Sequence, residues 1–322
     1  MTDVKTDVKT NVATGVFPEL QWETDTPENH NLDADVLADV ARELADVSDR
    51  HGFLVVKDGV IVHETYYRGD AQSLCKIFSL TKGFGAALTG IAVANNWLTV
   101  TDKVIDWLPY HAPDIVPGAT IEHILSMTAG HEPAGTTYEY TSGPILNTLP
   151  NILWLASGLP PRDFYHEFLA APLGLSFAWP TTEKGWFQIG NRGPMPVIEA
   201  SHRDVARLGL LWLRRGRWRD RQLISDDYIA ASLRPPFPAA NNAYGYLWWL
   251  NGADGTWRDA RGDSGQGSWL PEAPADLYMG IGARGKLLYL LPEHDMLIVS
   301  MGETQSGSVH DAWTRIKRIV PA

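Results

Sequence analysis

A serine and a lysine three residues apart, Ser79 and Lys82, stand at the start of an apolar segment that runs from residue 83 to 94. An apolar segment of this length predicts a buried helix, and side chains three residues apart share one face of a helix. The helix dipole beside the hydroxyl and the burial of the amine would both favour a nucleophilic serine with lysine as its base. This spacing therefore predicts a serine that can be acylated.

The same S-x-x-K spacing occurs a second time, at Ser73 and Lys76. Such a short pattern is expected by chance about once in a chain of this length. The first copy follows a polar, turn-like run at residues 68–72, and no long apolar segment begins directly behind it. We therefore expect Ser79 to be the nucleophile; the alternative for either copy is a capping serine with a surface lysine.

Two tyrosines in a hydroxyl-rich loop are candidates for a third catalytic group. Tyr138 and Tyr140 lie within residues 135–143, ahead of an apolar segment at residues 145–155. A tyrosine has a pKa near 10, so a phenol that acts as a base at neutral pH needs a neighbouring ammonium, and Lys82 would be that cation. Either tyrosine could supply the phenol, and the bend of the loop decides which one reaches Lys82.

These motifs resemble the serine β-lactamase and penicillin-binding-protein superfamily, in which S-x-x-K is followed by Y-x-S or Y-x-N. The resemblance is closest to the class C β-lactamase-like branch, which includes family VIII carboxylesterases and 6-aminohexanoate-dimer hydrolase. It covers nearly all of the chain after the first twenty residues. Further segments that resemble the branch, in the expected order, are residues 21–28, 52–64, 101–109, 123–130, 203–211 and 244–249.

The resemblance implies roles for residues of the second motif. It places the catalytic phenol on Tyr140, which would deprotonate Ser79 together with Lys82 and later activate water. Tyr138 would occupy the adjacent aromatic position. Ser142 would hydrogen-bond across to Lys82, or would serve only as a turn hydroxyl.

The third motif of the superfamily is expected on a strand near the end of the chain, where the sequence reads Gly280-Ile281-Gly282. The apolar runs at residues 287–292 and 296–301 predict a hairpin behind it. We assign the oxyanion hole to the N–H groups of Ala283 and Ser79, with the two glycines letting a carbonyl approach the backbone. Penicillin-recognising members have K-T-G here, and the missing lysine and hydroxyl argue against a dedicated β-lactamase.

The glycines at residues 280–285 also fit G-x-G-x-x-G, which occurs in dinucleotide-binding proteins and kinases. A dinucleotide site needs a helix directly after the glycines, whereas the residues that follow are strand-like. A kinase would need H-R-D after the glycine loop and then D-F-G, but the H-R-D at residues 202–204 precedes it and no D-F-G follows. The sequence therefore indicates neither a nucleotide site nor, with its ten scattered histidines, a metal site, and we expect no cofactor.

Aromatic side chains are candidates to line the substrate pocket, because the chain has 13 tryptophans. We expect Trp186 and Trp248 to contact the substrate, together with Tyr138 and Arg284. Other tryptophans near cleft-facing segments are Trp179, Trp249 and Trp269. Core or rim packing is the alternative for any one of them.

The composition restricts the partners. A net charge of −11 and an isoelectric point near 5.3 disfavour nucleic acids and anionic membranes, which need a basic face. A small-molecule ester or amide is the expected partner, and a homo-oligomer is compatible with the sequence. One cysteine, Cys75, and a polar N-terminal decapeptide without the apolar core of a signal peptide predict a cytoplasmic enzyme, unless a leader has been removed.

The resemblance implies an α/β (α+β) fold of the β-lactamase/transpeptidase-like type, with an antiparallel sheet flanked by helices and a helical lobe. In this sheet we expect the first hairpin, at residues 52–64, to pair with the last. The expected division is a tail and entry segment at 1–28, a sheet lobe from 29–72 and 190–322, and a helical lobe at 73–189. The expected function is that of a serine hydrolase that cleaves small carboxylic esters through an acyl-enzyme on Ser79. The alternatives are an amidase or peptidase of the aminohexanoate-dimer or D-amino-acid type, and a weakly catalytic acyl-binding protein.

Overall fold

The fold is built around a six-stranded sheet with the strand order β2-β1-β12-β11-β10-β7. The computed structural model describes residues 15–47, 49–109, 114–140, 144–177, 198–252, 254–303 and 309–321. The strands of the sheet are β1 (Arg50–Lys57), β2 (Val60–Tyr66), β7 (Trp249–Leu250), β10 (Tyr278–Gly282), β11 (Lys286–Leu291) and β12 (Met296–Gly302). All five pairings are antiparallel, and β1 pairs along its length with β12. The predicted pairing of the first hairpin with the last is therefore confirmed.

Both predicted hairpins follow from local sequence. The turn between β1 and β2 is Asp58-Gly59, whose φ angles of 54° and 89° lie in the left-handed region that suits a tight hairpin. Strands β11 and β12 consist entirely of buried residues, which explains why they appear in the sequence as unbroken apolar runs. The polar residues 292–295 form the connection between them.

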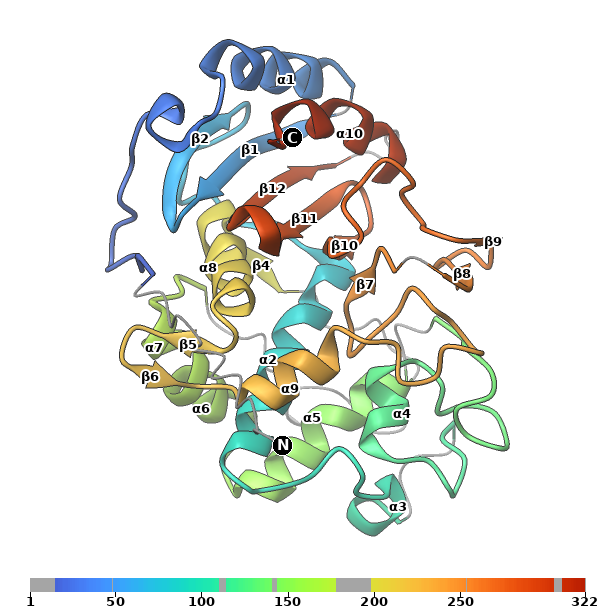
Figure 1. Cartoon of the computed structure of the whole chain (residues 1–322). Helices are drawn as coiled ribbons and strands as arrows, with labels where there is room; N and C mark the ends of the chain where they lie inside the picture. Colours follow the sequence, from blue (N-terminus) through green and yellow to red (C-terminus); the bar gives the residue numbers. More distant parts are fainter. Residues whose placement is uncertain are drawn as a thin grey trace, which may run out of the picture.

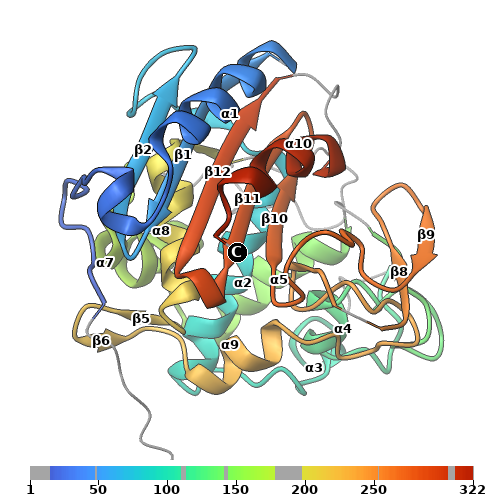
Figure 2. The same cartoon turned by 45° about the horizontal axis from the view of Figure 1, so that its top comes forward.

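Helices cover both faces of the sheet (Figures 1 and 2). On one face α1 (Ala34–Val47) packs on β1 and contacts α10 (Val309–Ile316). On the other face α8 (His202–Leu213) packs on β11 and β12. Gly209 of α8 allows this approach, because a Cβ atom there would lie 3.1 Å from side chains of both Leu288 and Leu290.

A helical part lies next to the sheet, around the buried helix α2 (Thr81–Ala94) (Figure 1). Its other helices are α3 (Val104–Trp107), α4 (Ile121–Leu125), α5 (Pro144–Ser157), α6 (Pro161–Tyr165) and α7 (Ala171–Leu173). Helix α9 (Asp226–Ser232) also packs here, since the Tyr228 hydroxyl donates to the Ala86 carbonyl over 3.0 Å. The Leu247 N–H likewise donates to the Leu125 carbonyl over 2.8 Å, so part of the segment that we expected in the sheet lobe lies against the helices.

Short elements connect these parts. The two-stranded pairs are β3 (Cys75–Lys76) with β4 (Glu199–Ala200), β5 (Arg217–Trp218) with β6 (Arg221–Gln222), and β8 (Thr256–Arg258) with β9 (Ser264–Gln266). The helical turns are η1 (Pro27–His30), η2 (Phe78–Leu80), η3 (His166–Ala170), η4 (Pro292–His294) and η5 (Lys317–Ile319). The β8–β9 hairpin extends from the edge of the molecule beyond β7 (Figure 1).

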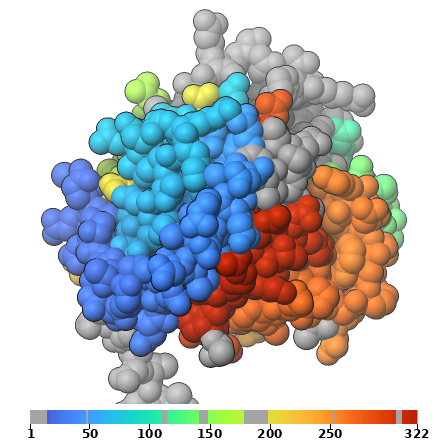
Figure 3. Space-filling view, turned by 90° about the horizontal axis from the view of Figure 1, so that it is seen from above, coloured from blue at the N-terminus to red at the C-terminus, as the bar shows by residue number. Residues whose placement is uncertain are grey.

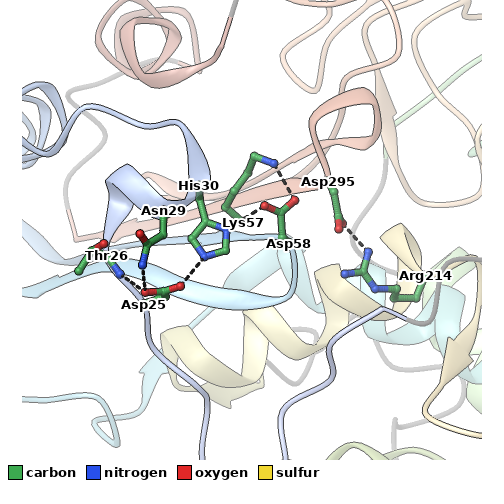
Figure 4. Close-up of polar contacts among 8 residues, drawn as sticks. All are labelled: Asp25, Thr26, Asn29, His30, Lys57, Asp58, Arg214 and Asp295. Atoms are coloured by element: carbon green, nitrogen blue, oxygen red, sulfur yellow. Dashed lines mark hydrogen bonds and ion pairs between the residues drawn. The ribbon is translucent and has the colours of Figure 1, made fainter.

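Polar contacts hold residues 25–30 against the first hairpin (Figure 4). The His30 ring contacts Asp58 at 2.8 Å through Nδ1 and Asp25 at 3.1 Å through Nε2, and Lys57 pairs with Asp58 at 2.7 Å. The space-filling view from above shows a blue segment from the N-terminal part of the chain next to a red segment from the C-terminal part (Figure 3). Helices α1 and α10, which contact each other, lie on the same face of the sheet.

Candidate active site

The proposed nucleophile lies where β3 leads into helix α2. Ser79 is in the turn η2, and Lys82 is in the first turn of α2, as the spacing predicted. The Lys82 Nζ donates a hydrogen bond to the Ser79 Oγ over 2.8 Å. Phe78, just before the serine, has a φ of 48°, which is unusual for a bulky residue and marks a constrained backbone at this point.

The competing S-x-x-K copy does not form such a pair. The Ser73 Oγ accepts from the Asp70 N–H and donates to the Asp70 Oδ1, each over 2.9 Å, so this hydroxyl closes an exposed turn. Lys76 is exposed on β3. In the S-x-x-K copy at Ser79 the lysine contacts the serine hydroxyl, whereas in the copy at Ser73 the hydroxyl is engaged by Asp70, so the structure favours Ser79 as the nucleophile.

Burial shifts the pKa of Lys82 to a value at which the amine can accept a proton. The side chain is almost fully buried among the apolar residues of α2, and this desolvation lowers its pKa from 10.5 to about 7. A substantial fraction of the amine is therefore neutral at neutral pH and can accept a proton. The direction of this shift agrees with the sequence analysis.

Tyr140 lies beside this pair and lines the same cavity as Ser79. The Lys82 Nζ is 4.4 Å from the centroid of the Tyr140 ring, above the ring face. Burial raises the pKa of Tyr140 to about 12, although its hydrogen bond with Ser79 acts in the opposite direction. Burial therefore keeps the pKa of Tyr140 high, in contrast to the expectation that Lys82 would lower it, and the phenol keeps its proton at neutral pH.

Tyr138 occupies a different environment, although it is only two residues away. Its ring packs against Tyr244 with 5.4 Å between centroids, and burial raises its pKa well above 10. Tyr138 is not among the described residues that line the cavity with Ser79, so this cavity does not support its predicted place in the substrate pocket. Two other candidates, Ser142 and Trp186, lie outside the described residues.

Strand β10 contributes Ile281 and Gly282 to the lining of this cavity, and the packing explains the glycine at position 282. A Cβ atom on Gly282 would lie 2.1 Å from the Ile77 carbonyl oxygen, so the strand touches the backbone that leads to Ser79. A Cβ atom on Gly280 would lie 3.4 Å from side-chain atoms of Leu80 and Trp248, which is an ordinary van der Waals distance. Gly282 therefore allows the segment that carries Ser79 to approach the strand, whereas we expected the glycines to admit a substrate carbonyl.

The cavity has a volume of about 630 Å³. Ser79 and Ala283, the two residues assigned to the oxyanion hole, both line it, and so does Arg284. Its aromatic lining consists of Tyr140, Trp249, Trp257 and Trp269. A serine, a lysine and a phenol therefore lie close together at a cavity with four aromatic lining residues, an arrangement that can support acyl transfer.

Trp248 is not part of this lining, in contrast to the prediction. It is fully buried and packs against Trp212, with 5.0 Å between ring centroids. Neighbouring residues in extended chain face opposite sides, so its neighbour Trp249 reaches the cavity instead. Trp257 was missed because it lies in a hairpin with no catalytic motif near it in the sequence.

A group of ionisable side chains lies next to Phe78, and we did not predict this group from the sequence. Lys286 is fully buried on β11 and pairs with Glu303 at 3.3 Å, while His51 and Arg284 contact the same carboxylate at 3.3 and 3.5 Å. Arg284 and Lys286 also face the Phe78 ring. The Arg284 Cζ atom is 5.3 Å and the Lys286 Nζ atom is 5.6 Å from the ring centroid. This group surrounds the constrained residue that precedes the nucleophile.

Within the described ranges no three His, Cys, Asp or Glu side chains converge as a metal site would require. The same ranges contain no helix with the length and apolar character needed to cross a bilayer.

Comparisons with solved structures show the same fold at low sequence identity. EstCE1, a hydrolase with promiscuous acyltransferase activity, is 14% identical with a TM-score of 0.65, over 91% of this chain and 99% of EstCE1. A Bacillus anthracis protein provisionally assigned as a 6-aminohexanoate-dimer hydrolase is 17% identical with a TM-score of 0.67, over 86% of this chain and 79% of that one. A β-lactamase/D-alanine carboxypeptidase from Pseudomonas syringae is 14% identical with a TM-score of 0.64, over 89% and 99%.

No curated protein matches the chain significantly in sequence. The family description that matches is Beta-lactamase, and the match runs over residues 37–320, which include every element that positions the site. The resemblance read from the motifs, the fold and the geometry around Ser79 therefore lead to one conclusion: this chain belongs to the Beta-lactamase family.

Proposed function

We propose that the protein is a serine hydrolase that cleaves small-molecule carboxylic esters through an acyl-enzyme on Ser79. The observation that carries this proposal is the 2.8 Å hydrogen bond between Lys82 Nζ and Ser79 Oγ at a cavity large enough for a small substrate. The low pKa of Lys82, about 7, supplies the base that an ordinary serine lacks.

In this mechanism the Ser79 Oγ attacks the ester carbonyl while Lys82 takes the hydroxyl proton. The developing oxyanion is stabilised by the N–H groups of Ser79 and Ala283. The protonated Lys82, with Tyr140 as a second donor, returns the proton to the leaving alkoxide, and the C–O bond of the ester breaks. A water molecule then gives a proton to neutral Lys82 and attacks the acyl carbon. Lys82 returns that proton to the Ser79 Oγ as the C–O bond of the acyl-enzyme breaks, which releases the acid and regenerates Ser79.

Amide hydrolysis is the second candidate, because two structural neighbours are described as a carboxypeptidase and, provisionally, an aminohexanoate-dimer hydrolase. We place esters first because an alkoxide leaves with less help from a proton donor than an amine does. A weakly catalytic acyl-binding protein would show a burst of product with no steady-state rate.

We expect lactams to be poor substrates, because residues 280–282 offer no lysine or hydroxyl to a lactam carboxylate. Lys286 does not replace the missing lysine, since it is fully buried against Glu303 and does not line the cavity. Arg284 does line the cavity, but it is already in contact with Glu303.

The test compares steady-state hydrolysis of p-nitrophenyl butyrate, a p-nitroanilide with the same acyl group, and nitrocefin. The proposal predicts the highest kcat/KM for the ester, and predicts that Ser79→Ala removes this activity while Ser73→Ala retains it. Faster turnover of the anilide would favour the amidase. Nitrocefin turnover equal to that of the ester would contradict the proposal.

A further inference from the structure

A continuous aromatic surface leads away from the catalytic residues. The ring centroids of Tyr140 and Trp249 are 5.4 Å apart, those of Trp249 and Trp269 are 4.9 Å apart, and those of Trp269 and Trp257 are 6.4 Å apart. The interplanar angles at these three steps are 30°, 38° and 40°, so the rings are tilted rather than perpendicular to one another. All four rings line the cavity that contains Ser79.

The cavity lining also contains aliphatic side chains. Ile281 and Leu287 form a cross-strand pair of β10 and β11, and Val309 at the start of α10 lies beside them in the lining. The lining also contains four charged residues, of which Asp259 is half-buried and Arg261, Asp263 and Arg284 are exposed. Trp249 and Trp269 are almost fully buried and Trp257 is half-buried, so a flat apolar group can contact these rings where they border the cavity and displace water there.

Trp257 forms the outer end of this surface and is held there by the β8–β9 hairpin. It pairs with Gly265 across the hairpin, and a Cβ atom on Gly265 would lie 2.5 Å from the Trp257 ring. The glycine therefore lets the indole lie across the neighbouring strand. Because the indole occupies the space that a side chain at residue 265 would need, the packing of the hairpin fixes the position of the Trp257 ring.

We propose that the substrate carries a planar aromatic group, that this group binds along the surface formed by Trp249, Trp269 and Trp257, and that Trp257 determines specificity for it. The inference rests on the proposed ester hydrolysis for the position of the carbonyl at Ser79. The aromatic group can belong to the alcohol or to the acyl part of the ester, and the two are separated by experiment.

The first experiment uses two matched pairs of unactivated esters, followed by pH-stat titration. Naphthylmethyl acetate and cyclohexylmethyl acetate differ only in the ring of the alcohol, while methyl naphthylacetate and methyl cyclohexylacetate differ only in the ring of the acyl part. The proposal predicts a lower KM for the naphthyl ester of one pair, and that pair identifies the part of the substrate that contacts the tryptophans. Equal KM values in both pairs would overturn it.

The second experiment changes the outer ring. Trp257→Ala should raise KM for the preferred naphthyl ester by about tenfold, the scale of one lost aromatic contact, while kcat and the cyclohexyl ester change much less. Trp257→Phe should recover part of the loss, and Gly265→Val should resemble Trp257→Ala because it displaces the ring. Trp154→Ala is the control, because Trp154 is a partly exposed tryptophan of α5 outside the cavity lining.

The third measurement separates this inference from the proposed reaction. Ser79→Ala protein, which should not hydrolyse esters, is titrated with naphthylmethanol and naphthylacetate, and binding is followed by calorimetry. Binding that is weakened by adding Trp257→Ala supports the aromatic site even if no ester is hydrolysed. Ester hydrolysis without such binding, or binding that Trp257→Ala and Trp154→Ala affect equally, would overturn the aromatic site and leave the hydrolase.

Discussion

Lys82 and Tyr140, the two groups beside Ser79, differ in their protonation at neutral pH. A substantial fraction of the amine is neutral, whereas the phenol keeps its proton. Burial lowers the pKa of Lys82 to about 7 and raises that of Tyr140 to about 12. The same physical cause, desolvation of the charged form, thus makes the amine a proton acceptor and leaves the phenol a donor. We therefore propose that Lys82 acts as the base and that Tyr140, which keeps its proton, donates a hydrogen bond to the leaving group.

The first prediction at this scale compares the two tyrosines. Tyr140→Phe should lower kcat for an activated ester by about a hundredfold, because it removes the donor next to Ser79. Tyr138→Phe should leave kcat within a few-fold, since its hydroxyl is buried beside Tyr244 away from the cavity. Steady-state rates of both variants on one ester decide the matter, and the opposite ranking would transfer the role to Tyr138.

The second prediction is the pH dependence of acylation. Because the amine must be neutral to accept the proton, kcat/KM should fall as the pH drops through about 7, with a single ionisation on this acidic side. Lys82→Met should lower activity by several orders of magnitude at every pH. A wild-type profile that stays flat down to pH 5 would show that Lys82 is not the base.

The stability of the protein gives an independent check on the same pKa. The pKa of Lys82 is 10.5 in the unfolded chain and about 7 in the fold, so between these values the unfolded chain binds the extra proton. The free energy of unfolding should therefore gain a rising contribution as the pH increases from 7 to 10.5. Denaturant titrations should show this contribution in the wild type and its absence in Lys82→Met.

At the scale of elements, the site depends on how closely β10 passes the turn η2. Gly282→Ala would bring a methyl group within 2.1 Å of the Ile77 carbonyl oxygen, and the turn that holds Ser79 must shift to make room. We expect a loss in kcat/KM of about a hundredfold, the scale for an ångström-sized displacement. The control is Gly85→Ala in α2, where the new methyl group would meet only a Leu247 carbon at 3.7 Å.

The two glycine variants should also differ in stability, as urea denaturation can measure. Gly85→Ala should stabilise the protein by up to about 1 kcal/mol, because alanine is the better helix former. Gly282→Ala should destabilise it by about 1–3 kcal/mol through overpacking. If Gly282→Ala proved as active and as stable as Gly85→Ala, the close contact between β10 and η2 would be refuted.

Several elements could be predicted from sequence because local residues determine them. The pairing of Ser79 with Lys82 follows from helical spacing, and the hairpin of β11 and β12 follows from two apolar runs around a polar turn. The choice between Trp248 and Trp249 could not be predicted, because it depends on the direction in which a two-residue strand joins the sheet. The position of Trp257 at the cavity could not be predicted either, because it depends on the path of the β8–β9 hairpin, which forms a separate two-stranded sheet.

At the scale of the whole molecule, the site is supported by contacts between distant parts of the chain. Glu303 at the end of β12 contacts His51 of β1, Lys286 of β11 and Arg284 of the preceding turn. No local pattern in the sequence brings these four residues together, which explains why the group was not predicted. Their charges meet only because the first and last hairpins pair in one sheet.

Glu303→Gln tests whether this group stabilises the fold. The substitution leaves Lys286 fully buried and opposite an uncharged side chain, so we expect a loss of at least about 2 kcal/mol in the free energy of unfolding. Glu293→Gln is the matched control, because Glu293 is an exposed residue of η4. Equal stability of the two variants in urea would show that the ion pairs contribute little.

The central claim is that Ser79 becomes covalently acylated, and one labelling measurement tests it directly. The protein is treated with a fluorophosphonate, digested and analysed by peptide mass spectrometry, alongside the variants Ser79→Ala and Ser73→Ala. We expect a single adduct on the peptide that contains Ser79, lost in Ser79→Ala and retained in Ser73→Ala. An adduct on Ser73, or labelling that persists in Ser79→Ala, would contradict it.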